Sequence, residues 1–326
     1  MIIVTGGAGF IGSAIVAELN LQGYENILIV DRLESDGKWK NLRKLKYTDY
    51  VEADDFYQVL LESDNDIGID VETIFHMGAC SSTTESDCSY LVRNNYECTK
   101  MLANWAVESD IRFIYASSAA TYGDGSLGFA DDEDEIEKLV PLNMYGYSKQ
   151  MFDLYAKRTG ILDRIAGLKF FNVFGPNEYH KADMRSFINK AFYQINETGK
   201  VRLFASDNPD YENGGQLRDF IYVKDAVSMT LFFMDNPDVN GIFNVGTGIA
   251  RNWNDLVTAT FKAMDKQPNI EYIPMPDKLR GKYQYFTQAD MTKLKSAGCS
   301  TATATLENAV ADYVRNYLAK DDFLGV

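Results

Sequence analysis

The stretch Ile2-Ile3-Val4-Thr5-Gly6-Gly7-Ala8-Gly9-Phe10-Ile11-Gly12 decides the fold. Its apolar start predicts a strand, which leads into three glycines spaced three apart, Gly6, Gly9 and Gly12, and then into a helical pattern. In a dinucleotide site, the first glycine allows a tight turn, the second lets the backbone approach a pyrophosphate, and the third lets helix and strand pack closely. The free N–H groups and the dipole at the helix N-terminus favour phosphate.

The residues after this helix distinguish a dinucleotide site from an ordinary glycine-rich turn. A second apolar run, Ile27-Leu28-Ile29-Val30, ends at Asp31. This is close to the spacing at which an acidic side chain binds the ribose of a dinucleotide. The strand, the glycines, the helix and the acid together predict that the chain binds a dinucleotide.

The composition is typical of a soluble globular protein. Hydrophobic residues make up 46% of the chain and charged residues 24%, and a length of 326 residues suits about two domains. The 32 basic and 47 acidic residues give a net charge of −15. This charge argues against general binding to nucleic acid or to an anionic membrane.

Targeting and metal signals are weak. No run of about 20 apolar residues is present, and no basic region precedes the first strand, so we expect neither a membrane span nor a signal peptide. The four cysteines form no C-x-x-C pair, and we expect them to be reduced, as in a cytoplasmic protein. With two histidines in the chain, no metal site is expected.

Strand and helix patterns alternate through the first half of the chain. Strands are predicted at 2–5, 27–30, 71–76, 112–116 and 165–169. The helix-length segments between them predict right-handed βαβ units, and so an α/β fold with a Rossmann-type doubly wound parallel sheet. We expect residues 1–170 to form this nucleotide-binding domain, joined by about 222–248 and 284–301. Residues 171–326 would mainly form a smaller mixed α/β substrate-binding domain, and the acidic stretch 124–138 a solvated loop without chemistry.

Three side chains in this first half suggest proton transfer. Tyr145 and Lys149 are four residues apart and would share one face of a helix. A lysine beside a tyrosine favours the phenolate, so we expect the pKa of Tyr145 to be lowered. Ser118 follows a predicted strand, where its hydroxyl would bind an oxygen of a ligand at the sheet's carboxyl edge. A surface pair and a serine-rich turn are the alternatives when each motif is taken alone.

Together, the glycine turn, Ser118, Tyr145 and Lys149 resemble the extended short-chain dehydrogenase/reductase superfamily, which includes nucleotide-sugar epimerases and dehydratases. The resemblance covers essentially the whole chain. It implies that the tyrosine moves a proton to or from a sugar hydroxyl, that the lysine also binds the nicotinamide ribose, and that the serine positions the reacting oxygen. These roles fall on Tyr145, Lys149 and Ser118.

Finer motifs resemble the ADP-L-glycero-D-manno-heptose 6-epimerases within that superfamily. They occur in the same order and comprise 76–85, 117–123, 145–149, 171–176, His180-Lys181, 272–284 and 286–290. The resemblance implies a redox-neutral inversion at C6 of a heptose by bound NADP, through a transient 6-ketone that turns its other face. It also implies a second acid/base residue, which matches Lys181. A surface lysine or a phosphate contact is the alternative for that residue.

The same resemblance assigns further contacts. Around the cofactor it places the three glycines with Phe10, Ile11, Asp31, Arg32, Lys38, Met77, Gly78, Ala79, Cys80, Ser81, Asn94, Lys149, Val173 and Lys181. Around the substrate it places Ser81, Ser118, Asn172, Asp183, Phe204, Arg218 and Tyr283. Arg218 suits a diphosphate through its fork of donors, and a salt bridge to Asp219 is its alternative.

The chain departs from the family pattern at three cofactor positions and in one loop. Arg32 replaces an asparagine, Met77 an acidic residue, and Ala53 a basic cofactor contact. Arg32 with Lys38 favours a 2′-phosphate and hence NADP, whereas Asp31 alone favours NAD. An insertion at 209–215 precedes Arg218 and bears on the choice of sugar nucleotide.

Rival functions remain open. The nearest is an epimerase of another nucleotide sugar, such as a UDP-hexose 4-epimerase, against which Lys181 and the segment 278–284 argue. A 4,6-dehydratase would need an acidic pair where this chain has Ala119-Ala120. A non-catalytic NADP(H)-binding sensor is the alternative from another class. By resemblance, we also expect a homo-oligomer.

Overall fold

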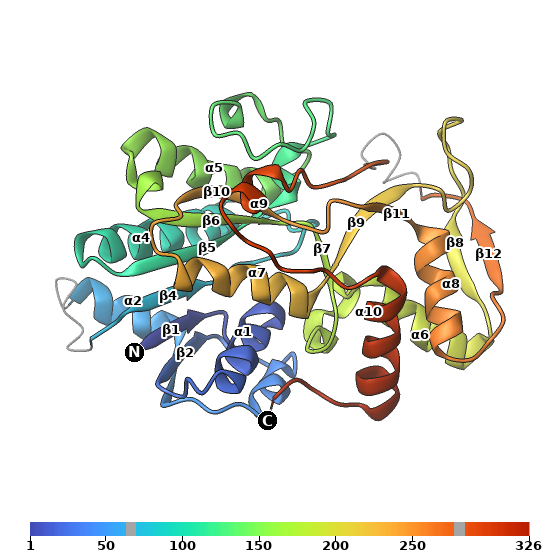
Figure 1. The fold of residues 1–326 in the computed structure, drawn as a ribbon, viewed down its shortest axis with the longest axis horizontal. Coiled ribbons are helices and arrows are strands. Elements are labelled where there is room, and N and C mark those ends of the chain that lie inside the picture. The colour runs from blue at the N-terminus through green and yellow to red at the C-terminus, as the bar shows by residue number, and fades with distance from the viewer. Residues whose placement is uncertain (63–69, 277–283, 326) are drawn as a thin grey trace.

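The computed structural model describes residues 1–62, 70–276 and 284–325. Within them, the largest sheet has seven strands in the order β10-β6-β5-β4-β1-β2-β3, and every neighbouring pair is parallel (Figure 1). The strands are β1 (Ile2–Thr5), β2 (Ile27–Asp31), β3 (Asp49–Glu52), β4 (Thr73–His76), β5 (Arg112–Ser118), β6 (Ile165–Phe170) and β10 (Gly241–Val245). The predicted doubly wound parallel sheet is confirmed.

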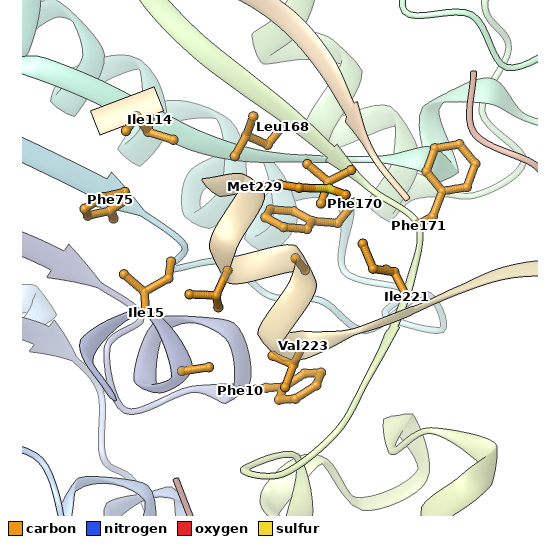
Figure 2. Packing of buried hydrophobic residues seen from close by; sticks show 14 of the residues in the cluster. Phe10, Ile15, Phe75, Ile114, Leu168, Phe170, Phe171, Ile221, Val223 and Met229 are labelled. Atoms are coloured by element: carbon orange, nitrogen blue, oxygen red, sulfur yellow. The ribbon is translucent and has the colours of Figure 1, made fainter. Parts of the chain in front are cut away.

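Helices cover both faces of this sheet. The helices are α1 (Phe10–Leu21), α2 (Ala53–Glu62), α3 (Cys88–Leu91), α4 (Cys98–Glu108), α5 (Met144–Thr159) and α7 (Val223–Asp235). Side chains alternate between the faces along a strand. Figure 2 shows Phe75, Ile114 and Leu168 on the face toward α7 and α1, together with Ile15 and Met229. Each such buried apolar side chain stabilises the fold by roughly 1.5–3 kcal/mol.

The second half of the chain adds two smaller sheets. One has the order β11-β9-β7 and the other pairs β12 with β8. Their strands are β7 (Asn172–Phe174), β8 (Val201–Phe204), β9 (Leu217–Tyr222), β11 (Ala250–Asn252) and β12 (Ile270–Ile273), and the helices here are α6 (Phe187–Thr198), α8 (Trp253–Ala263), α9 (Thr292–Ser296) and α10 (Leu306–Asp312). α8 packs against both α6 and α10. Among the described helices, none is long and apolar enough to cross a membrane.

Short 3-10 and π-helical segments connect these elements. The 3-10 segments are η1 (Lys38–Leu42), η3 (Ala119–Tyr122), η4 (Ile136–Lys138), η5 (Ile161–Asp163), η6 (Tyr179–Met184) and η9 (Leu318–Lys320), and the π-helical ones are η2 (Val92–Glu97) and η8 (Tyr313–Tyr317). Three of them, η1, η2 and η6, carry residues of the site described below.

The expectation of a purely solvated loop at 124–138 is wrong. Asp131 is buried, and its carboxylate accepts a hydrogen bond from the backbone N–H of Asn244 at 2.8 Å. Glu133 accepts from the N–H of Ile242 at 2.9 Å and pairs with Lys293. β10 is an edge strand, and its outward N–H groups need partners. Asp131 and Glu133 therefore provide acceptors for the backbone N–H groups of β10 at the edge of the sheet.

Candidate active site

A cavity of about 610 Å³ opens at the carboxyl ends of the parallel strands. Sequence segments far apart meet around it, as expected where an open α/β sheet binds a ligand. Most of the predicted site residues line it: Gly6, Gly9, Phe10, Ile11, Gly12, Asp31, Arg32, Lys38, Met77, Gly78, Ala79, Cys80, Ser81, Asn94, Ser118, Tyr145, Lys149, Asn172, Val173 and Lys181.

The glycine turn forms a cradle that larger residues would fill. Gly6 has φ of +66°, and a Cβ there would lie 2.7 Å from the backbone nitrogen of Gly78. A Cβ on Gly12 would collide with the carbonyl oxygen of Gly6. Gly9 precedes α1 without a side-chain cap, which leaves the helix N-terminus open to an anion. These features fit the pyrophosphate of a dinucleotide.

The carboxylate of Asp31 braces this turn. Its Oδ2 accepts from the N–H groups of Ala8 and Gly9 at 2.9 and 3.1 Å. Its Oδ1 accepts from the N–H of Arg32 at 2.7 Å and lies 3.2 Å from Nζ of Lys38. Asp31 is buried at the end of β2, so the acid predicted to face the ribose also holds the phosphate turn in shape.

Ser118 and Tyr145 meet beside the cavity. Ser118 ends β5, and its hydroxyl accepts from the N–H of Ala120 at 3.1 Å. A side-chain hydrogen bond joins Ser118 to Tyr145. The pKa of Tyr145 is raised, because burial disfavours the phenolate more than the bond to Ser118 favours it. The predicted lowering of this pKa is therefore wrong for the protein without a bound ligand.

Lys149 lies one helical turn after Tyr145, as predicted. α5 begins after Asn143, whose side chain accepts from the N–H of Gly146 at 2.8 Å. Nζ of Lys149 donates to the carbonyl oxygen of Ala116 at 2.8 Å, at the end of β5. Burial lowers the pKa of Lys149 to about 8. The lysine is thus held between the helix and the strand that carry Tyr145 and Ser118.

Lys181 enters the cavity from another element, η6. Its Nζ lies 5.4 Å from the ring centre of Phe10, and burial lowers its pKa. The buried Glu178 shapes this segment, because its carboxylate accepts from the hydroxyls of Ser186 and Tyr313 at 2.6 and 2.9 Å. Two elements, α5 and η6, therefore present one acid/base candidate each to the same cavity.

Sequence reasoning missed several residues that organise the site. The side-chain oxygen of Asn95 accepts from the N–H of Cys80 at 2.8 Å, and its Nδ2 donates to the carbonyl oxygen of Cys80 and to the hydroxyl of Ser148, both at 3.0 Å. Asp153, buried one turn after Lys149, accepts from Ser117 at 2.7 Å. The spacing of Asp153 from Lys149 was a usable signal, since residues four apart share a helix face. Asn95 and Glu178 carried no such signal.

Three of the predicted substrate contacts do not line this cavity. Asp183, Phe204 and Arg218 are not among the described residues that line the cavity, and Tyr283 lies outside the described residues. Arg218, in β9, donates to the carbonyl oxygens of Leu217 and Gln284. Across the described residues, no group of three or more His, Cys, Asp or Glu side chains is placed to hold a metal ion.

The fold and the cavity define a nucleotide-binding enzyme of the short-chain dehydrogenase/reductase type. The model of the NAD dependent epimerase/dehydratase family matches residues 2–246. The chain is 59% identical over 322 residues to the ADP-L-glycero-D-manno-heptose-6-epimerase of Nitratidesulfovibrio vulgaris, covering 99% of each chain. It therefore belongs to the NAD dependent epimerase/dehydratase family and, within it, to the ADP-L-glycero-D-manno-heptose-6-epimerases, as the sequence motifs predicted.

Solved structures share the fold of this chain. The Helicobacter pylori ADP-L-glycero-D-manno-heptose-6-epimerase is 27% identical, with a TM-score of 0.82, and the match covers 98% of this chain and 96% of that one. MoeE5 in complex with UDP-glucose and NAD is 26% identical, with a TM-score of 0.76, and the match covers 98% and 99% of the two chains.

Proposed function

We propose that the protein inverts C6 of ADP-D-glycero-β-D-manno-heptose to give the L-glycero epimer, with NADP bound throughout. The observation that carries the proposal is the pairing of Tyr145, from α5, with Lys181, from η6, around one cavity. The name of the 59% identical relative supports the substrate. NADP, when bound, supplies reversible hydride transfer.

Tyr145 is the acid/base for one face of the reacting carbon. Its phenolate takes the proton of the C6 hydroxyl during oxidation, while Ser118 holds the same oxygen by a hydrogen bond. The nearby Lys149 ammonium favours the phenolate, and it donates to Ala116, which keeps it in place. The raised pKa of Tyr145 in the free protein means that ligand binding has to supply part of its activation.

Lys181 serves the opposite face. Inversion requires the 6-ketone to turn its other face toward the cofactor. In that orientation its oxygen points away from Tyr145, so another residue has to return the proton. A lysine whose pKa is lowered by burial exchanges protons nearer neutral pH than an exposed lysine does. Asn172, which lines the same cavity, is proposed to hold a sugar hydroxyl.

The adenosine end of the cavity supports NADP. Arg32 and Lys38 both line it, and two cations suit a 2′-phosphate. Asp31, at the end of β2, suits the ribose hydroxyls of NAD, which is the alternative cofactor. The substrate's ADP would contact Arg218, Phe204 and Tyr283, and Ser81 and Asp183 would contact the sugar.

One incubation tests this function. Purified protein with ADP-D-glycero-β-D-manno-heptose, and with no added nucleotide, is expected to form the L-glycero epimer, followed by NMR. A substrate carrying deuterium at C6 is expected to keep it, because the hydride returns. Turnover of a UDP-hexose in place of the heptose would replace the assignment with a 4-epimerase, and no turnover of either sugar would support a nucleotide sensor.

Assembly, location and domain division stay predictions. We expect a cytoplasmic homo-oligomer with a nucleotide-binding part, mainly 1–170, and a substrate-binding part, mainly 171–326. Light scattering after size exclusion measures the assembly. Limited proteolysis with and without nucleotide tests the division.

A further inference from the structure

The guanidinium of Arg32, which is predicted to favour NADP, already forms hydrogen bonds to side chains of the protein. Nε and Nη2 of Arg32 donate to Oδ1 of Asp54 at 3.1 and 2.6 Å. Nη1 donates to the side-chain oxygen of Asn94 at 2.8 Å. All three guanidinium nitrogens therefore have partners within the chain. The guanidinium lowers the pKa of Asp54, so this carboxylate stays charged.

The second cation is held as well. Nζ of Lys38 lies 3.2 Å from Oδ1 of Asp31 and 3.9 Å from Oδ2 of Asp36. Asp31 cannot turn away without losing its bonds to the N–H groups of Ala8 and Gly9. Among the described residues, this corner thus contains two cations and the three carboxylates that pair with them. A 2′-phosphate, which is a dianion near neutral pH, must compete with those carboxylates.

Of the three carboxylates, Asp54 is the most exposed, so it is the one whose side chain can move away from its cation. Its side chain is 77% exposed, and it lies in the first turn of α2, one residue after Ala53. Ala53 also lines the cavity and carries no charge, so a 2′-phosphate here depends on Arg32 and Lys38. While Arg32 is bound to Asp54, its charge is only partly available to such a phosphate.

We propose that Asp54 determines the choice between NADP and NAD by positioning Arg32. The ion pair with Asp54 competes with a 2′-phosphate for the guanidinium and so weakens the binding of NADP. NAD has no such phosphate, so the affinities for the two nucleotides become more similar. This inference rests on the proposed function, since it assumes that the cavity holds a dinucleotide.

The test measures binding to the full-length protein freed of nucleotide. Calorimetric titration with NADP and with NAD gives the ratio of the two dissociation constants. Asp54→Asn is expected to tighten NADP by about 3- to 10-fold, the size expected for losing one exposed ion pair and one like charge, and to change NAD less than about twofold. Asp55→Asn is the matched control, because it removes the same charge from the same helical turn. It is expected to leave the ratio within about twofold.

A double variant isolates the role of Arg32. In an Arg32→Gln background, Asp54→Asn is expected to change the ratio by no more than the twofold allowed for Asp55→Asn, because only the like-charge part of its effect remains. The proposal is overturned if Asp54→Asn leaves the ratio unchanged, if it weakens NADP, or if its full effect persists without Arg32. Failure of every folded variant to bind either nucleotide would overturn the proposed function too. Normal binding with an unchanged ratio overturns the role of Asp54 alone.

Discussion

Oδ2 of Asp153 lies 3.9 Å from Nζ of Lys169, and both side chains are fully buried. The pair joins α5 to β6. Asp153 also accepts from the hydroxyls of Tyr115 and Ser117 at 2.9 and 2.7 Å, and Lys169 donates to Thr121 at 2.9 Å. This network connects the strand that ends at Ser118 to the helix that carries Tyr145 and Lys149.

Breaking the pair is expected to destabilise the fold strongly. Asp153→Ala leaves the Lys169 ammonium buried without its counterion, which costs about 3–5 kcal/mol. Urea unfolding at pH 7 measures the loss. Asp153→Leu combined with Lys169→Met removes both charges and is expected to lose much less. Asp134→Ala, at a side chain 95% exposed, serves as the control, and a loss below about 1 kcal/mol for Asp153→Ala would contradict the prediction.

Lys149 is expected to lower the stability of the enzyme. Its pKa is about 8 in the folded protein and about 10.4 when unfolded, so the folded state loses stability as the pH falls from about 10.4 to 8. The cost is complete below pH 8. Lys149→Met is therefore expected to raise stability at pH 7 by about 1–2 kcal/mol, after allowing for the lost bond to Ala116. Inversion should be lost.

Unfolding of Lys149→Met in urea, beside the exposed Lys138→Met, provides the measurement. A Lys149→Met protein less stable than the parent at pH 7 would show that the lysine contributes more by its contacts than it costs by its buried charge.

His76 is expected to make stability depend on pH. Burial lowers its pKa to about 3, and its ring bonds Thr5 and Thr99 at 2.7 and 2.8 Å. The unfolded chain takes up this proton below about pH 6.5, whereas the folded chain does not until about pH 3. Acid therefore favours unfolding across this window, at up to about 1.4 kcal/mol per pH unit.

His76→Gln should reduce the slope of unfolding free energy against pH between 6 and 5 by about this amount. Chemical unfolding at closely spaced pH values gives the slope. Parallel curves for the parent and His76→Gln would mean that the histidine does not remain neutral in the folded state.

Tyr145→Phe and Lys181→Met are each expected to slow inversion by about 10²- to 10⁴-fold, because each removes one of the two acid/base groups. Both variants should keep bound nucleotide, which mass spectrometry of the purified proteins detects. Lys200→Met, at a partly exposed lysine of the second half that pairs with Glu271, is the control. Near-full activity of Lys181→Met would show that one residue serves both faces.

Features of the fold and site that depend on residues close together in the sequence were predictable. The glycine spacing, the strand before Ser118 and the four-residue step from Tyr145 to Lys149 are local, so the parallel sheet and the centre of the site follow from them. β3 and α2 were not predicted. Strand β3 is the half-exposed edge strand Asp49–Glu52, and it shows no clear alternation or apolar run.

The sequence by itself determined that a dinucleotide turn, a strand-end serine and a Tyr–Lys helix step occur in one chain, because backbone geometry ties each to short spacings. Only the tertiary structure decided the charges around them. Arg32 meets Asp54, Asp153 meets Lys169, and burial reverses the expected shift in the pKa of Tyr145. Such pairings and desolvation depend on which distant segments pack together, and no local spacing encodes that.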